Sequence, residues 1–159
     1  MTAAAEGIGA QRRARAREVV AAFGASVVLG LVLLLFFEVD VQQADPAELV
    51  ARRTDARAFF AGDYLFIVLY ALVSPIAIRR FGATFEGGPP VWLTLAVLLL
   101  PLAGIVDATE NALLLSSTGS PSPDAVDFAH ALAIPKIVLF VGGAGCAIAV
   151  VIRAIRVLR

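Results

Sequence analysis

The sequence has little of what disulfides, cysteine metal sites and nucleic-acid surfaces require. Its 159 residues include one cysteine, Cys146, which excludes an intrachain disulfide and a metal site built from cysteines. Charged residues make up 16% of the chain, against about 25% in an average soluble domain. Lysine and arginine balance aspartate and glutamate at 13 each, so the formal net charge is zero. A neutral chain argues against nucleic acid as a partner.

Motifs for catalysis and for cofactor binding are also lacking. No serine has a histidine or lysine at a spacing typical of nucleophilic catalysis. The run Gly142-Gly143-Ala144-Gly145 lies in an apolar segment, which indicates helix packing rather than a phosphate loop. Asp107, Glu110 and His130 have the chemistry of metal ligands, but the Glu-x-x-His and paired-histidine motifs of helical metal sites are missing. We therefore expect no cofactor and no metal.

What the sequence does contain is long apolar runs, since 60% of its residues are hydrophobic. Four runs have about the 20 residues that a helix needs to cross a bilayer: residues 19–37, 59–78, 91–116 and 128–152. Backbone groups in lipid must be paired within the segment, so these runs must be helices. We predict an all-α integral membrane protein with one transmembrane domain, residues 19–152. A disordered basic segment, residues 1–18, is expected before it, and a basic tail, residues 153–159, after it.

The arginines are distributed unevenly along the chain. Nine of the twelve lie before span one, between spans two and three, or after span four. The loop between spans one and two and the loop between spans three and four have three arginines together, offset by Glu38, Asp40 and further acidic residues. The positive-inside rule therefore predicts that both termini are cytoplasmic. The arginine and alanine bias suggests a bacterial chain, which places the protein in the plasma (inner) membrane. Membrane lipids are the expected partners of the arginine-rich ends.

Short loops predict an antiparallel bundle in which each span neighbours the next. Asp45-Pro46-Ala47-Glu48 has the residues of a helix start, which predicts a short external helix leading into span two. Residues 85–90 predict a cytoplasmic turn, and residues 117–123 an exposed external loop. Pro75, Pro101 and Pro135 lie within spans and should kink or loosen them.

Small residues recur at four-residue intervals in two of the spans, which predicts close helix packing. They are Ala22, Ser26 and Gly30 in span one, and the pairs Gly143 with Ala147 and Gly145 with Ala149 in span four.

Ionisable side chains interrupt spans two, three and four. At 1.5 Å per helical residue, Asp107 lies about 14 Å and Glu110 about 9 Å from the external end of span three, with Asn111 beside them. Lys136, the one lysine of the chain, lies about 12 Å into span four, and Asp63 about 6 Å into span two. All of them therefore occupy the external half of the bilayer. His130 lies about 3 Å into span four and Tyr64 directly follows Asp63. Both are expected at the lip of the site.

Spacing predicts that these groups converge inside the bundle. Asp107, Glu110 and Asn111 follow an i, i+3, i+4 pattern and share one helix face. An aspartate and a lysine exposed to lipid would together cost about 5–7 kcal/mol, so they should face inward and pair. Three carboxylates against one ammonium leave two negative charges unmatched. Either some of the carboxyl groups are protonated, or a cation lies beside them.

Three interpretations follow. In the first, the site opens to the external side and binds a proton, a cation or a small polar ligand, for transport or sensing. Its residues are Asp63, Asp107, Glu110, Asn111 and Lys136. A unit of this size is small for a transporter, so a homo-oligomer is then expected. In the second, an enzyme acts on lipid or isoprenoid headgroups, with Asp107 or Glu110 as general base and Lys136 as electrophile. In the third, a structural subunit uses an ion pair to fix helix register. The sequence leaves the ligand and any catalytic residue unknown.

Overall fold

The structure is a computed structural model that describes residues 2–36, 45–120 and 122–159. Every regular element in these ranges is a helix, which confirms the all-α prediction. The elements are α1 (Thr2–Phe36), α2 (Pro46–Ala51), α3 (Arg53–Val68), a π-helical turn η2 (Leu69–Val73), α4 (Ser74–Gly82), α5 (Val91–Ser117) and α6 (Pro123–Leu158).

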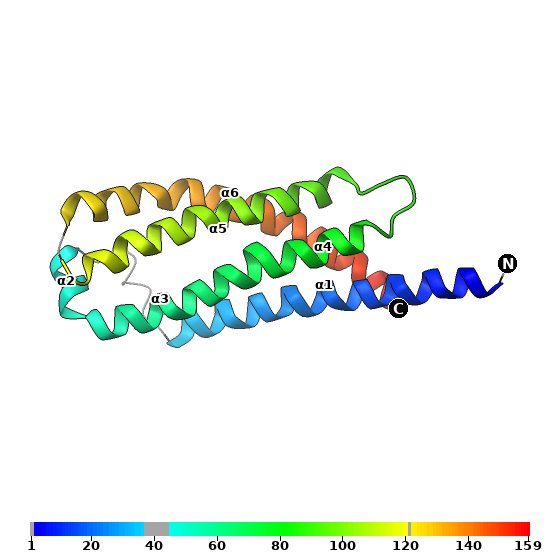
Figure 1. Ribbon diagram of the computed structural model, residues 1–159, viewed down its shortest axis with the longest axis horizontal. Helices are drawn as coiled ribbons and strands as arrows, with labels where there is room; N and C mark the ends of the chain where they lie inside the picture. The colour runs from blue at the N-terminus through cyan, green and yellow to red at the C-terminus, as the bar shows by residue number, and fades with distance from the viewer. Residues whose placement is uncertain (1, 37–44, 121) are drawn as a thin grey trace.

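Four helical stretches of the described chain are long and apolar enough to cross a membrane. They are Gly7–Leu35 in α1, Arg53–Gly82 through α3, η2 and α4, Val91–Ser117 in α5 and Pro123–Leu158 in α6. They include the four predicted spans except Phe36 and Phe37. Phe37 lies outside the described residues, as do Glu38 and Asp40. Figure 1 shows the four stretches as an elongated bundle in which each runs opposite to the one before it.

The N-terminal segment differs from its prediction. Helix α1 begins at Thr2, whereas disorder was expected through residue 18. Alanine and arginine are good helix formers and residues 2–18 contain no proline, so the segment can continue the helix that span one starts.

The residues that predict a helix start before span two do begin a helix, α2. The Asp45 side chain accepts a hydrogen bond from the Glu48 backbone N–H at 2.8 Å, and Pro46 occupies the first turn of α2. The short helix does not run straight into span two, because it ends at Ala51 and α3 begins at Arg53.

Both predicted turns are present, but the second is less exposed than expected. Helix α4 ends at Gly82, and Gly87 and Gly88 then have positive φ values of 84° and 92°, which turn the chain before α5 begins at Val91. After α5, Ser117 and Thr118 are buried rather than exposed. Their hydroxyls donate to the carbonyls of Leu113 and Leu115, so they satisfy their hydrogen bonds within their own helix end.

Proline loosens span two at the place where loosening was predicted. Pro75 has no N–H to donate to the carbonyl of residue 71, and its ring would collide with that carbonyl in a regular α-helix. The widened π-helical turn Leu69–Val73 comes directly before this position and gives the ring room. Pro101 and Pro135 lie inside α5 and α6, which continue through them as helices.

Two apolar clusters of described residues hold the bundle, one toward each end. The larger joins residues of α1, α3, η2, α4, α5 and α6, including Ala16, Phe81 and Val150. The smaller lies at the end formed by α2 and the start of α3, where Leu49 and Phe60 pack against residues of α5 and α6. Along each of α3, α5 and α6, the polar residues of the spans fall between the two clusters. The polar groups therefore form a layer with apolar packing on both sides.

Close helix contacts depend on the predicted small residue Gly143 and on Gly104, which was not among the predicted ones. A side chain at Gly104 would collide with Ala71, and one at Gly143 would lie 2.9 Å from Leu100. The predicted packing pair Gly145 and Ala149 is wrong, because both residues are exposed on α6. The rotation of α6 set by its buried residues turns that pair outward.

Helices α1 and α6 meet at one end and separate at the other. Ala16, Val19 and Ala22 of α1 belong to the same cluster as Ala147, Val150 and Ala154 of α6. The described α1 contributes no residue to the smaller cluster at the opposite end. Figure 1 shows the same divergence: the C-terminal part of α6 crosses α1, whereas its first turns lie beside α5.

Candidate functional site

Helices α3, α5 and α6 bring all five predicted site residues into one layer of the bundle. Asp63 comes from α3, Asp107, Glu110 and Asn111 from α5, and Lys136 from α6. The four residues of α3 and α5 are buried. The i, i+3, i+4 spacing on α5 therefore does place its three polar side chains on the inward face.

Lys136 bridges two carboxylates of α5. Its Nζ lies 2.7 Å from Glu110 Oε2 and 3.3 Å from Asp107 Oδ1. The three side chains are 14%, 2% and 8% exposed respectively. This ion pair links α6 to α5, and its members are shielded from the surroundings of the bundle.

Asp63 has a neutral partner in place of a cation. The Asn111 Nδ2 donates a hydrogen bond to Asp63 Oδ2 at 2.6 Å. Within the described residues Asp63 forms no ion pair. The other end of the same amide, Asn111 Oδ1, is buried without a hydrogen-bond partner in that part of the chain. The carboxylate of Asp63 is therefore held in place but not neutralised.

Tyr70 is a member of the layer that the prediction of the site omitted. Its hydroxyl donates to Asp107 Oδ2 at 2.9 Å, so Asp107 is held by Tyr70 on one oxygen and by Lys136 on the other. The signal was present in the sequence, because Tyr70 follows Asp63 by seven residues and so falls on its helix face. Four residues further on, Ser74 turns to α1, where its hydroxyl lies 3.3 Å from that of Ser26.

The charges of the layer do not balance. Three carboxylates stand against the single ammonium of Lys136, and that ammonium is already shared by Asp107 and Glu110. With all groups ionised the layer carries two negative charges, as the sequence predicted. The attraction between opposite charges is far stronger in such a protected layer than in water, and so is the repulsion between like charges.

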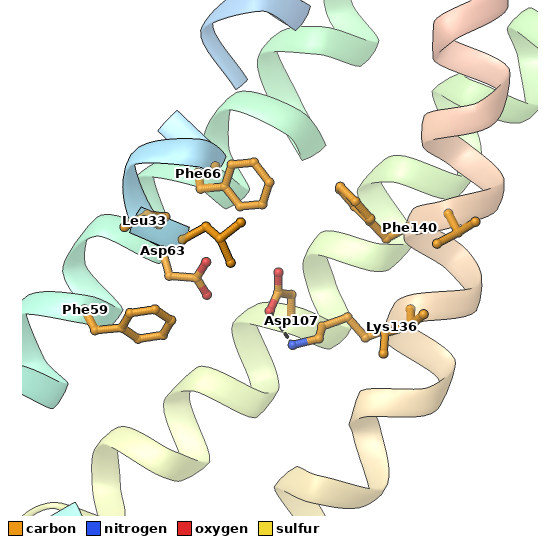
Figure 2. A pocket seen from close by; sticks show the side chains of 11 residues that line it. Leu33, Phe59, Asp63, Phe66, Asp107, Lys136 and Phe140 are labelled. Atoms are coloured by element: carbon orange, nitrogen blue, oxygen red, sulfur yellow. Dashed lines mark ion pairs between the residues drawn. The ribbon is translucent and has the colours of Figure 1, made fainter. Parts of the chain in front are cut away.

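A cavity of about 450 Å³ lies beside this layer, within the range of small-molecule sites. Asp63, Asp107 and Lys136 form its polar wall, and the remaining wall is apolar. In Figure 2 the carboxylates of Asp63 and Asp107 point toward each other across the space, with Lys136 reaching in from α6. Phe59, Phe66 and Phe140 are among its lining residues.

Helix α1 supplies an apolar wall that the sequence did not identify as part of a site. Gly30, Leu33 and Leu34 of α1 face Ile137 and Val141 of α6 across the cavity. The lining residues belong to α1, α3, α5 and α6, and the expected opening toward the external loops stays a prediction. The cavity therefore occupies the region where α1 and α6 diverge.

The two residues expected at the lip of the site do not line the cavity. The Tyr64 hydroxyl donates to the Ala108 carbonyl at 3.3 Å, which joins α3 to α5. His130 is partly buried, and its Nε2 has no hydrogen-bond partner within the described residues. Neither side chain is placed to contact a molecule bound between Asp63 and Asp107.

Acidic and histidine side chains do not form a metal centre in the part of the chain that the structure describes: no group of three or more His, Cys, Asp or Glu is arranged to hold an ion there. The ammonium group of Lys136 already lies beside Asp107 and Glu110, where a metal ion would have to compete with it for the two carboxylates. The described side chains of the layer interact by charge pairing and hydrogen bonding. No protein-family model, curated protein or solved structure matches the chain.

Proposed function

We propose that this chain is a multi-pass protein of the bacterial plasma membrane that binds a cation beside Asp63 and Asp107, for transport or sensing. In this proposal the four helical stretches cross the membrane and both termini are cytoplasmic. The observation that carries the proposal is the Asp63 carboxylate, which is buried, has no ion-pair partner among the described residues and lines a cavity.

The surface of the bundle supports a location in lipid. Large apolar side chains are exposed along all four stretches, among them Val28, Leu72, Ile105 and Val138. Soluble monomers rarely expose contiguous apolar surface of this extent. Arg79, Arg80 and the C-terminal arginines gather near the opposite end from the α2 segment, and this supports a cytoplasmic placement of that end.

A purely structural role explains Lys136 but leaves Asp63 unexplained. The pairing of Lys136 with Asp107 and Glu110 is what a register-fixing ion pair requires. Asp63 adds a further buried charge that such a pair does not need. Since Lys136 is already bound to two carboxylates, its use as an anion holder for catalysis on lipid headgroups is less well supported than cation binding.

Cation binding is tested by thermal unfolding of the protein in lipid nanodiscs. The probes are Na⁺, K⁺, tetramethylammonium and dodecyltrimethylammonium, each as the chloride at equal ionic strength. A ligand at a hundred times its Kd stabilises by about 2.7 kcal/mol, which corresponds to a rise in Tm of about 5–10 °C for a chain of this length. We expect at least one probe to raise the Tm of the natural protein by this amount.

The matched variant is Asp63→Asn, which removes the charge and keeps an oxygen for the Asn111 hydrogen bond. The rise in Tm should be absent in this variant. If all four cations shift both proteins equally, the effect comes from ionic strength or from lipid, and the proposed function is wrong. Transport by a unit of this size would require a second copy, so the mass of the protein in nanodiscs is measured in the same samples.

A further inference from the structure

The position of the cavity indicates what kind of cation it would hold. We propose that the ligand is an amphiphilic organic cation, with one cationic group and an aliphatic chain, and that it enters sideways from the lipid between α1 and α6. This inference rests on the proposed function, because it names the class of cation that the site would bind.

The mouth of the cavity lies far from either end of α6. Ile137 and Val141 line it 14 and 18 residues after Pro123, which corresponds to about 21 and 27 Å along the helix. The hydrocarbon layer of a bilayer is about 30 Å thick. Leu34, Ile137 and Val141 each line the cavity and are also exposed on the outer surface of the bundle. The gap between these side chains therefore lies on the side of the bundle, which faces lipid tails when the four stretches cross the membrane as proposed.

The interior is suited to a cationic headgroup. Asp63 and Asp107 place two carboxylates on the cavity wall, and a single positive charge between them would reduce the excess of two negative charges to one. The rings of Phe59, Phe66 and Phe140 line the same space. Aromatic rings attract cations, including quaternary ammonium groups that cannot donate hydrogen bonds.

A second cavity extends the first and gives room for an aliphatic chain. It has a volume of about 240 Å³ and shares Gly30, Leu34, Phe66 and Phe140 with the first cavity. Its further lining residues include Phe23 of α1 and Ala144 of α6, so it continues along the same pair of helices toward the place where they meet. Charge at one end and an apolar channel at the other match an amphiphile and not a small hydrated ion.

The test is isothermal titration calorimetry of the protein in nanodiscs, with dodecyltrimethylammonium and tetramethylammonium as probes. The two ions have the same headgroup, but only the first partitions into lipid. Asp63→Asn nanodiscs provide the blank, because they take up the same amount of probe into their lipid. We expect dodecyltrimethylammonium to bind the natural protein at least tenfold more tightly than the variant, and tetramethylammonium to bind at least tenfold more weakly than the long-chain ion.

The lateral route is tested with Val141→Trp, which places a large ring at the mouth. Val138→Trp is the matched control, since Val138 lies on the same helix, is 66% exposed against 63% for Val141, and does not line the cavity. We expect Val141→Trp to weaken binding of the long-chain cation at least fivefold and Val138→Trp to leave it unchanged. Equal effects of the two variants would overturn entry between α1 and α6.

The other outcomes separate this inference from the proposed function. If tetramethylammonium binds as tightly as the long-chain ion, and both depend on Asp63, the cation site stands and the amphiphile is wrong. If no cation distinguishes the natural protein from Asp63→Asn, both proposals fail. Native mass spectrometry of the same nanodiscs provides the last control. The inference would be overturned if a phospholipid or a second copy of the chain is bound equally to the natural protein and to Asp63→Asn, and if the probe does not displace it.

Discussion

Replacing Lys136 by methionine removes the one cation that links α6 to the carboxylates of α5. Its Nζ lies 2.7 Å from Glu110 and 3.3 Å from Asp107. At an effective dielectric constant of about 20, Coulomb attraction at these distances is about 6 and 5 kcal/mol before the cost of desolvation. Measured losses on breaking a buried pair are smaller, about 3–5 kcal/mol. We expect Lys136→Met to lower the free energy of unfolding by this amount.

Second substitutions should restore stability in an order set by the structure. Glu110 lies closer to Lys136 than Asp107 does and is more deeply buried, whereas Asp107 keeps its hydrogen bond from Tyr70 when the lysine is gone. The double variant Lys136→Met with Glu110→Gln should therefore recover more of the loss than Lys136→Met with Asp107→Asn.

The measurement is unfolding by SDS in bicelles, followed by circular dichroism, with Val138→Met as the control for a methionine on the surface of α6. A loss below about 1 kcal/mol for Lys136→Met would mean that the pair behaves as an exposed surface pair and that the buried layer is wrongly described. Greater rescue by Asp107→Asn than by Glu110→Gln would refute the order derived from the distances.

Two further predictions concern packing and orientation. Gly104→Ala should destabilise the fold by about 1–3 kcal/mol, since the added methyl group collides with Ala71. The control is Gly145→Ala, which meets no atom within 4 Å and should be close to neutral in the same SDS titration. Equal effects of the two substitutions would contradict the packing of α5 on η2. In a cysteine-free background, Ser120→Cys should react with a membrane-impermeant maleimide in intact cells, whereas Glu86→Cys should react only after the membrane is opened. Labelling in the reverse order would invert the proposed orientation.

The helices of this protein were predictable because their signals are local. Each span is an apolar run bounded by charge, proline or glycine, and the start of α2 follows from Asp45 and Pro46 alone. The N-terminal extension of α1 was missed because its residues carry no apolar pattern. Their helical state follows from helix propensity and from continuity with the span, and both are weaker signals than hydropathy.

The polar layer was predictable in its members and less so in its surroundings. Depth along each helix and the shared face of Asp107, Glu110 and Asn111 were enough to bring the charges together. The cavity depends on the divergence of α1 from α6, which is a property of helix tilt and leaves no mark in either sequence segment. For that reason Leu33 and Phe140, which look like ordinary lipid-facing or core residues, were not identified as part of its wall.

The turn at Leu69–Val73 makes the two halves of the second span rotate relative to each other. Asp63 before the turn and Tyr70 within it bond to residues of α5, whereas Ser74 directly after the turn lies against Ser26 of α1. A π-helical turn holds about one residue more than an α-helical turn, so deleting one residue here would let the span close into a regular α-helix with both halves facing almost as before. A single deletion here should therefore be tolerated better than a single deletion in the middle of α5, where each residue turns the helix by about 100°.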